Sequence, residues 1–374
     1  MNATSTLQSG LSIIICCYNS AARLPVTLAH LAAQQGAGFA WEVILVDNNS
    51  SDGTAAVAER EWQRHGAPAP LRVVAEPRPG LLYARERGLA SIAHELILFC
   101  DDDNWLAPDY LREACVLMQD GTIGILGGRN VAVADAPLPA WFAGFEQAYA
   151  CGPQAAHDGD VSSARLYIAG AGMVTRHAVY RALAELGFRS YLTGRTGASL
   201  SSGEDTEFSI VTALLGYRLV YSSRLVLKHY MEPARLRWSY FLKLNRGHAQ
   251  SYYKLALYKQ LYTQGQLNPD WLAYFKSAPG LGGGMPALRR LLRWGGLYAR
   301  RAQQREGNEA AVEAFFNIEL WRMHLRFRAE YPSFVAALNA LGQRLRQYRG
   351  THPPRPAAGA APVPRAAPAA VPAP

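Results

Sequence analysis

Residues 11–19 read LSIIICCYN, and this stretch indicates the fold class. Residues 11–17 are almost continuously apolar and rich in β-branched side chains, which is typical of a strand buried on both faces. Three more runs of this kind are predicted as strands, and single helices separate them. Strands joined by single helices favour βαβ units and a parallel sheet with right-handed crossovers. The strands are predicted at 11–17, 41–46, 71–75 and 95–100, and the helices after a cap at Asn19 or Ser20, from Asp52 and Gly53 to about residue 65, and at 80–93.

The regular alternation weakens after residue 100. Strands are predicted at 123–128, 129–133, 166–174 and 217–226, a helix at 203–216, and a long irregular loop at 137–160. From about residue 237 the pattern is helical, with helices predicted at 237–262, 286–303, 308–329 and 333–348. The last residues are mostly alanine and proline, which predicts a disordered tail. Three regions are therefore expected, at 1–230, 231–350 and 351–374.

The net charge of +9 is unevenly distributed. Residues 1–230 carry 17 lysines and arginines against 22 aspartates and glutamates, whereas residues 231–350 carry 19 against 7. A uniformly basic nucleic-acid coat is therefore excluded, and no nucleic-acid partner is expected. Residues 1–10 lack the basic and apolar segments of a signal peptide, and no apolar run approaches the roughly 18 residues that span a bilayer. Five cysteines without a CxxC pair favour a reducing, cytoplasmic setting.

Polar residues follow each predicted strand of the first half. Open parallel sheets bind ligands beyond the carboxyl ends of their strands. The four polar clusters would gather along that edge, so the sequence predicts a site for a polar ligand there. The clusters are YNS at 18–20, DNNSSD at 47–52, EPR at 76–78 and DDDN at 101–104.

Two acidic clusters suggest chemistry. Asp101, Asp102 and Asp103 follow a buried strand, where three carboxylates repel one another unless a hard cation such as Mg²⁺ or Mn²⁺ neutralises them. On an extended segment Asp101 and Asp103 would share one face. A solvated turn that caps the next helix would also explain the triplet. Glu204 and Asp205 begin a predicted helix, where they either complement the helix dipole or present a general base.

These motifs and their order resemble the family-2 glycosyltransferases, which have the GT-A fold. The resemblance rests on an apolar strand ending in Tyr-Asn, a VDNNSSDGT segment, a Gly-Leu-x-x-Ala-Arg helix, a DxD motif and a downstream Glu-Asp pair. They lie at 15–19, 46–54, 80–88, 101–103 and 204–205. The resemblance implies an α/β fold of the GT-A type, with a mostly parallel, Rossmann-like sheet flanked by helices. Residues 1–230 would be the catalytic domain, and residues 231–350 a helical extension.

The resemblance also implies an activity: a sugar would move from a nucleotide-sugar, with a UDP-sugar as the first candidate, to an acceptor hydroxyl with inversion. Asp205 would deprotonate the acceptor, with Glu204 beside it. Asp101 and Asp103 would hold a divalent cation, Mn²⁺ or Mg²⁺, and His229 is either a third ligand or a packed histidine. The residues implied in donor binding are Cys17, Tyr18, Asn19, Asp47, Asn49, Arg85, Asp101 and Asp102.

Some residues depart from the family pattern. Glu86 stands where Asn is usual, and Asn48 replaces the second Asp of its segment. The Arg-Trp pair at 237–238 matches part of the Gln-x-x-Arg-Trp motif of processive members, but Ala234 occupies the Gln position, which favours single additions. A metal-dependent nucleotidyltransferase and a non-catalytic nucleotide-binding protein are the alternatives. The first is disfavoured because residues 18–21 lack the glycine and lysine of a phosphate loop.

The basic region 231–350 has two interpretations. It is a helical extension packed on the catalytic domain, or a surface that binds an anionic membrane and brings the enzyme to a lipid-linked acceptor. A glycan is the other class of acceptor, so a role in cell-surface polysaccharide or glycolipid assembly is expected, with the enzyme in the cytoplasm or on the inner face of the membrane. Loops at 134–165 and 189–202 are expected to build the pockets for the donor sugar and the acceptor.

Overall fold

The computed structural model describes residues 8–35, 38–192, 202–277, 285–300 and 305–354. Within these residues a nine-stranded mixed sheet has the order β3-β2-β1-β4-β8-β6-β9-β5, and β7 pairs with β9. The strands are β1 (Gln8–Cys17), β2 (Trp41–Asp47), β3 (Leu71–Ala75), β4 (His94–Phe99), β5 (Asn104–Leu106), β6 (Ile123–Val133), β7 (Gly159–Asp160), β8 (Val174–Arg176) and β9 (Arg218–Tyr230). The helices are α1 (Leu24–Ala32), α2 (Thr54–Arg64), α3 (Leu81–Leu89), α4 (Tyr110–Leu117), the 3₁₀ helix η1 (Phe142–Tyr149), α5 (His177–Glu185), α6 (Glu204–Leu214), α7 (Trp238–Gln264), α8 (Trp271–Ser277), α9 (Met285–Ala299), α10 (Glu309–Phe327) and α11 (Tyr331–Thr351).

Strand β1 lies inside the parallel half of the sheet, as its sequence predicts. Strands β2 and β4 pair with β1 in parallel, and β3 pairs in parallel with β2. The register places Cys17 beside Asp47, and Asp47 beside Ala75. The carboxyl ends of three neighbouring strands therefore meet at one edge of the sheet, directly before the polar clusters.

Both faces of β1 are buried, which explains its continuous apolar sequence. Ile13 and Ile15 belong to a core cluster that includes Leu28 of α1, whereas Ile14 packs on the other face with Ala84 of α3. Helix α3 lies so close that a Cβ at Gly88 would sit 2.6 Å from a methyl carbon of Ile14. Because helices cover both faces, the sheet needs no polar side chains along this strand.

The second half of the sheet is mixed rather than parallel. Strand β8 pairs antiparallel with both β4 and β6, and β5 pairs antiparallel with β9, while β6 and β9 are parallel. Parallel pairing is therefore complete in the N-terminal half, whereas in the second half only the described pair β6 and β9 is parallel. The short strand β5 places Asn104 opposite His229, and this pairing carries the acidic triplet to β9.

Two local predictions are wrong because side-chain hydrogen bonds replace the expected pattern. Residues 166–173 form no strand, because successive backbone N–H groups donate to side chains: Ile168 to Ser209, Ala169 to Gln154 and Gly170 to Asp205. Neither Asn19 nor Ser20 caps α1 with its side chain. Arg23 is the N-cap residue, and the backbone carbonyl of Ser20 accepts the N–H groups of Arg23 and Leu24.

Other differences concern elements that the sequence pattern did not separate or show. The strands predicted at 123–128 and 129–133 are one strand, β6, with an irregularity between Gly127 and Arg129. The predicted loop at 137–160 contains η1 and β7. Elements β5, α5 and α8 were not predicted. Three segments with predictions lie outside the described residues: residues 1–7, residues 193–201 of a predicted pocket loop, and the predicted tail from residue 355.

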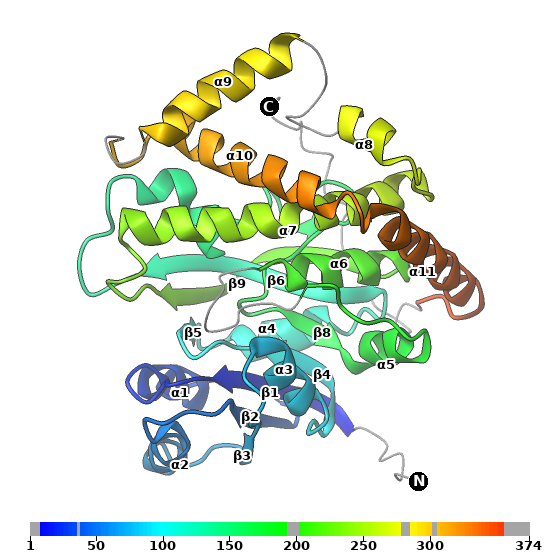
Figure 1. Ribbon diagram of the computed structural model, residues 1–374. Helices are drawn as coiled ribbons and strands as arrows, with labels where there is room; N and C mark the ends of the chain where they lie inside the picture. Colours follow the sequence, from blue (N-terminus) through cyan, green and yellow to red (C-terminus); the bar gives the residue numbers. More distant parts are fainter. Residues whose placement is uncertain (1–7, 36–37, 193–201, 278–284, 301–304, 355–374) are drawn as a thin grey trace.

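The C-terminal helices share a core with the second half of the sheet. A single cluster joins Ile125 of β6 and Leu219 of β9 to Ile210 of α6, Leu257 of α7 and Leu338 of α11. Figure 1 shows α7 lying along the sheet, with α10 and then α9 stacked beyond it. No helix in the described part of the chain is long and apolar enough to cross a membrane. The change in charge near residue 230 therefore coincides with the end of β9 but not with the end of a core.

Candidate active site

A cavity of about 870 Å³ opens at the sheet edge where β1, β2 and β4 end. Its size lies within the range of small-molecule sites. The cavity is lined from the first half by the turns after these strands and the start of α3, and from the second half by η1, residues 165–171, the start of α6 and one face of α7. Its polar and charged lining residues are Tyr18, Arg23, Asn48, Asn49, Arg85, Asp101, Asp102, Asp103, Gln147, Tyr149, Arg165, Tyr167, Ser202, Glu204, Asp205, Thr206, His229, Arg235, His248, Tyr252 and Lys259.

The end of the cavity beside β1 and β2 holds three residues predicted for donor binding. Tyr18, which is 58% exposed, and Asn49 line it, together with the buried thiol of Cys17. Burial raises the pKa of Cys17 well above its usual range, so this thiol is neutral. The structure thus offers an aromatic ring and an amide at this end.

Asn19 and Asp47 are not among the residues that line the cavity. The side-chain oxygen of Asn19 accepts the N–H of Ser51 at 2.9 Å, and that of Asp47 accepts the N–H of Ser50 at 3.0 Å. Asn19 in turn donates its own N–H to the hydroxyl of Ser50 at 3.0 Å. These two residues fix the turn after β1 against the turn after β2, and their role in donor binding stays a prediction.

Asn48, a departure from the family pattern, has a structural reason. Its amide donates to the carbonyl oxygens of Glu76 at 2.9 Å and Arg78 at 2.6 Å, and its side-chain oxygen accepts the N–H of Gly80 at 2.9 Å. An aspartate could not donate the first two hydrogen bonds. Asn48 therefore ties together the loops after β2 and β3 and sets the start of α3.

Arg85 of α3 carries a buried positive charge into the cavity. Its Nη1 lies 3.5 Å from Oε1 of Glu204, and its guanidinium lies 5.2 Å from the centre of the Phe99 ring. Burial alone would lower the pKa of Arg85, but the carboxylates of Glu204 and Asp101 raise it. The side chain therefore stays charged and links α3 to α6.

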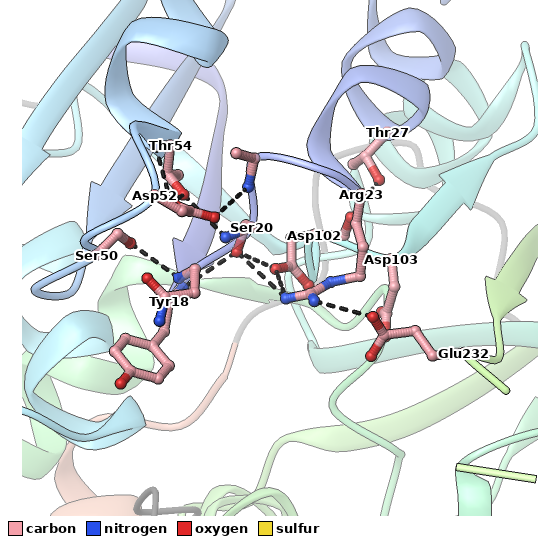
Figure 2. Close-up of polar contacts among 12 residues, drawn as sticks. Tyr18, Ser20, Arg23, Thr27, Ser50, Asp52, Thr54, Asp102, Asp103 and Glu232 are labelled. Atoms are coloured by element: carbon pink, nitrogen blue, oxygen red, sulfur yellow. Dashed lines mark hydrogen bonds and ion pairs between the residues drawn. The ribbon is translucent and has the colours of Figure 1, made fainter. Parts of the chain in front are cut away.

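Asp102 is anchored by residues around the start of α1 (Figure 2). Its Oδ2 accepts hydrogen bonds from Nη2 of Arg23 at 2.7 Å and from the hydroxyl of Ser20, and Arg23 also contacts Glu232 at 3.2 Å. Burial and the neighbouring charge of Asp103 raise the pKa of Asp102 to about 6, against the opposing effect of Arg23 and Ser20. The middle residue of the triplet thus fixes the loop between β4 and β5.

Asp103 lies where β5 meets β9. Its Oδ2 accepts a hydrogen bond from Nη1 of Arg235 at 2.7 Å, and its Oδ1 accepts one from the amide of Asn104 at 2.9 Å. The same Oδ1 lies 3.4 Å from Nε2 of His229. Asp101 and His229 line the same cavity as Asp103, and the role of these three residues as metal ligands stays a prediction.

The chemistry of these residues suits a divalent cation. Carboxylate oxygens from Asp101 and Asp103 and an imidazole nitrogen from His229 are donors that Mn²⁺ accepts, while Mg²⁺ prefers oxygen alone. Among the residues described, no group of three or more His, Cys, Asp or Glu side chains is arranged to hold a metal ion. The guanidinium of Arg235 lies against one oxygen of Asp103, so a positive charge already faces this carboxylate.

The first turn of α6 presents two carboxylates to the cavity. Asp205 is held by the backbone, because its Oδ2 accepts the N–H of Gly170 at 2.9 Å and its Oδ1 accepts the N–H of Thr206 at 2.7 Å. Glu204 contacts Arg85 through Oε1, whereas its Oε2 is buried and accepts no hydrogen bond from the described residues. Asp205 is therefore the more firmly oriented of the two.

The sequence prediction missed the residues that α7 contributes to the cavity. His248, Tyr252, Leu255 and Lys259 line it from one face of this helix. Their spacing of four, three and four residues is that of a helix face, and this was the signal that could have found them. Arg235, just before α7, was missed for a different reason, because its partner Asp103 is distant in sequence.

Arg165 and Tyr167 were missed as well, and the sequence holds no signal for them. Tyr167 lies in the segment that was predicted as a strand, and Arg165 is the last residue of the predicted pocket loop at 134–165. Leu166 between them has a φ of 64°, a left-handed conformation that is rare for a bulky residue. This conformation, which sequence patterns do not show, lets both neighbours reach the same cavity.

Family models match two overlapping parts of the chain. The model for glycosyl transferase family 2 matches residues 12–149, and the model for glycosyl transferase family group 2 matches residues 96–329, more than half of the chain. An uncharacterized glycosyltransferase of Mycobacterium tuberculosis is 31% identical over 132 residues, which are 35% of this chain and 53% of that protein. An N-acetylglucosaminyltransferase of Mesorhizobium japonicum is 33% identical over 121 residues, which are 32% of this chain and 28% of that protein. The chain thus spans about half the length of the mycobacterial relative, and less of the second.

A solved structure shares the fold. A mannosyltransferase from Pyrobaculum calidifontis, in complex with GDP-Man and Mn²⁺, superposes with a TM-score of 0.53 at 18% identity, over 86% of this chain and 88% of that one. This likeness concerns the fold, which is the GT-A type that the sequence predicts. Together with the family-group match over more than half of the residues, it leads to one assignment. The chain belongs to the family-2 glycosyltransferases.

Proposed function

We propose that this chain is an inverting glycosyltransferase that moves a sugar from a nucleotide-sugar to an acceptor hydroxyl. The observation that supports the proposal is the composition of one cavity. It holds an aromatic ring and amides at the end beside β1 and β2, the acidic triplet after β4, and the paired carboxylates Glu204 and Asp205 at the start of α6. A nucleoside, a diphosphate and a reacting hydroxyl need these three kinds of group.

In this proposal the nucleoside binds beside Tyr18 and Asn49, and the diphosphate lies beside the acidic triplet. A divalent cation held by Asp101, Asp103 and His229 would neutralise negative charge on the diphosphate. Oxygen ligands and a diphosphate are a usual setting for such a cation. A solved structure with the same fold supports a nucleotide-sugar as donor, because it is a mannosyltransferase in complex with GDP-Man and Mn²⁺.

Asp205 is the proposed base. Its carboxylate takes the proton of the acceptor hydroxyl while the acceptor oxygen bonds to the anomeric carbon of the sugar. The bond from that carbon to the diphosphate oxygen breaks, and the nucleoside diphosphate leaves with the bonding electrons. Attack on the face opposite the leaving group inverts the anomeric centre. The N–H groups of Gly170 and Thr206 orient the base, and Arg85 orients Glu204 beside it.

The decisive experiment is a screen of UDP-, GDP- and dTDP-sugars against the purified protein, with and without Mn²⁺. We expect one of these donors to stabilise the protein against heat and to release its nucleoside diphosphate in a metal-dependent way. Release of pyrophosphate would instead identify a nucleotidyltransferase. Absence of any nucleotide binding would contradict both enzyme functions and leave a protein without this catalytic role.

The acceptor is proposed to be a glycan or lipid-linked molecule of the cell surface, reached through contact with an anionic membrane. Support comes from the charge of residues 231–350, and from α9, where Arg289 and Arg293 are exposed near Leu292, which is 69% exposed. Basic side chains beside an exposed aliphatic residue suit an anionic bilayer surface.

A further inference from the structure

The cavity contains a pair of cationic side chains that the proposed reaction does not use. Arg165 and Lys259 both lie over the ring of Tyr167, with the guanidinium carbon 4.2 Å and the ammonium nitrogen 6.0 Å from its centre. All three side chains line the cavity. In the described part of the chain neither cation forms an ion pair with a carboxylate, although the chain has carboxylates elsewhere in the same cavity.

Arg165 is held in a fixed position by neutral groups. Its two terminal nitrogens donate to the carbonyl of Gln154 at 2.9 Å, the side-chain oxygen of Gln147 at 3.0 Å and the hydroxyl of Tyr167 at 2.8 Å. Its Nε is buried and donates to none of the described residues. A buried charged donor without a partner is costly, so Arg165 keeps a hydrogen-bonding capacity that the described residues do not fill.

The backbone between these residues is strained toward the same arrangement. Leu166 adopts its left-handed conformation with its side chain in the core and its N–H donated to the carbonyl of Val161 at 3.0 Å. Strained residues of this kind persist where surrounding contacts fix them, and they are enriched at functional sites. Arg165 and Tyr167, on either side of Leu166, both line the cavity.

No carboxylate of the described residues forms an ion pair with Arg165 or Lys259, so the charges of these two side chains are not neutralised by direct contact. Burial lowers the pKa of both Arg165 and Lys259, and the charge of Arg165 lowers that of Lys259 further. A ligand with negative charge would reverse this effect and accept hydrogen bonds from both groups. Apart from these pKa shifts, the positions of the two cations over the ring of Tyr167 suit an anion. Lys259 comes from α7, and Arg165 and Tyr167 come from the loop before β8.

The position of the pair relates it to the acceptor rather than to the diphosphate. The segment that carries Arg165 and Tyr167 is hydrogen-bonded to α6, because the N–H of Gly170 donates to Asp205 at 2.9 Å and the N–H of Ile168 donates to the hydroxyl of Ser209 at 3.2 Å. The cation pair therefore lies on the side of the proposed base, where the acceptor hydroxyl must approach.

We infer that Arg165 and Lys259 form a subsite for a negatively charged group, a phosphate or carboxylate, on the acceptor that is glycosylated in this cavity. This inference rests on the proposed function and narrows its acceptor to an anionic glycan or a phosphate-linked lipid. Tyr167 forms the apolar surface beneath the two cations. Arg165 and Lys259 are specificity-determining residues, and the chemistry at Asp205 does not require them.

Lys259→Met is the test variant, and Lys254→Met is its matched control. Lys254 lies on the same helix but outside the cavity lining, where its ammonium contacts the carbonyl of Tyr191 at 3.5 Å. Lys259→Arg keeps the charge and tests rescue. Calorimetry would measure binding of glucose 6-phosphate, glucuronate and glucose, and of a polyprenyl phosphate in detergent micelles, while UDP and GDP report on the donor site. Thermal unfolding confirms that each variant is folded.

We expect at least one anionic probe to bind more tightly than glucose, and to lose about tenfold or more in affinity in Lys259→Met, because a hydrogen bond to a charged group is removed. Lys259→Arg and Lys254→Met should keep most of that affinity, and nucleotide affinity should not change. If the affinity of glucose 6-phosphate or glucuronate falls in Lys259→Met, the acceptor is a charged glycan. If the affinity of the polyprenyl phosphate falls instead, the acceptor is a phosphate-linked lipid.

Three results would overturn the inference: equal binding of glucose and the anionic probes, no binding of any anionic probe, or a loss in Lys259→Met that affects nucleotide rather than acceptor probes. The last result would assign the pair to the donor diphosphate. Failure of the proposed function would appear separately, as the absence of nucleotide binding to the wild-type protein. The two outcomes can be told apart because binding of the sugar probes is also measured without nucleotide.

Discussion

Single side chains in the cavity differ in how firmly they are held. Both carboxylate oxygens of Asp205 accept backbone N–H groups, whereas Glu204 relies on one long contact with Arg85. A base must keep its position while its charge changes during the reaction, and backbone donors supply that support. This difference favours Asp205 over Glu204 as the proton acceptor.

Asp205→Asn should therefore lower the rate of transfer by about 100-fold or more, the usual contribution of a general base, while nucleotide binding stays near the wild-type value. Steady-state transfer and calorimetry with the donor would measure the two effects. Asp109→Asn is the matched control, since Asp109 is 44% exposed before α4 and outside the cavity. Full turnover by Asp205→Asn would remove this residue from the role of base.

The contact between Arg23 and Asp102 should matter for stability. Removing the guanidinium in Arg23→Met leaves a largely buried carboxylate with fewer partners, so the free energy of unfolding should fall by about 1–3 kcal/mol. Chemical denaturation would measure it. Arg60→Met, at a pair whose arginine is 64% exposed, should change stability by less than about 1 kcal/mol.

A second substitution distinguishes the mechanism of that loss. If the cost comes from the uncompensated charge, Asp102→Asn in the Arg23→Met background should restore part of the stability, because it removes that charge. Equal effects of Arg23→Met and Arg60→Met would show that the contact in Figure 2 adds nothing to the fold.

Residue identity alone predicted part of this site. Asp101 and Asp103 were predicted at the polar edge of the sheet, and they line the cavity there together with His229, while their role as metal ligands stays a prediction. Asn19 and Asp47 were predicted to bind the donor, but their side chains are engaged by neighbouring N–H groups. Such local hydrogen bonds depend on turn geometry, which a single sequence does not specify.

At the scale of elements, strands with continuous apolar sequence were predicted well. Strands β1, β2 and β4 were predicted within a few residues, because both faces of these central strands are buried. The edge strand β3 was predicted at its observed bounds, although it is only partly buried. The segment 166–173 failed because Ser209, Gln154 and Asp205 hold its backbone from distant positions in sequence. An apolar pattern indicates that a segment is buried, but it does not indicate which groups form hydrogen bonds with its backbone.

Helices α8 and α10 meet at a buried histidine. His324 is 2% exposed, its Nε2 lies 3.1 Å from the hydroxyl of Tyr274, and its Nδ1 lies 2.8 Å from the carbonyl of Leu320. Burial lowers the pKa of His324, although the Leu320 carbonyl opposes this effect. The folded state thus prefers the neutral ring.

The contact should make stability depend on pH. A histidine with a lower pKa in the folded state stabilises the fold above its unfolded pKa of about 6.5, and this stabilisation is lost as pH falls through the folded pKa. The Tm of the wild-type protein should fall between pH 7 and pH 5, and His324→Gln should reduce that slope. Calorimetric scans across this range would measure it.

His65→Gln is the control for this experiment, because His65 is exposed at the end of α2. Its slope of Tm against pH should match that of the wild-type protein. If His324→Gln also keeps the full wild-type slope, other groups cause the acid sensitivity and the buried contact between α8 and α10 does not.

At the scale of the whole molecule, opposite charges lie on parts that share one core. The acidic first half supplies the carboxylates of the cavity, while the basic second half supplies Arg235 and Lys259 to the same cavity. The amino-acid counts show the difference in charge between the two halves, but they do not show that both halves line one cavity. Helix α7 runs back along the sheet, and its packing on α6 and the sheet brings its residues to the ends of the strands.

The basic surface leads to a prediction for the intact protein. It should float with vesicles that contain anionic phosphatidylglycerol at low salt, and release should follow as the salt rises to about 0.5 M, because screening weakens attraction between exposed charges. Neutral phosphatidylcholine vesicles are the control. Failure to float with anionic vesicles at low salt would contradict the membrane proposal and favour the other interpretation, in which residues 231–350 are a helical extension packed on the catalytic domain.

Helix α7 packs into the core with one face and lines the cavity with the other. Tyr253, Leu257 and Tyr258 are buried in the shared core, whereas Tyr252 and Lys259 line the cavity. For an engineer, this separation divides the helix into positions to keep and positions to vary. A library limited to residues 248, 252, 255, 256 and 259 would vary the wall of the cavity and leave the core residues Tyr253, Leu257 and Tyr258 unchanged.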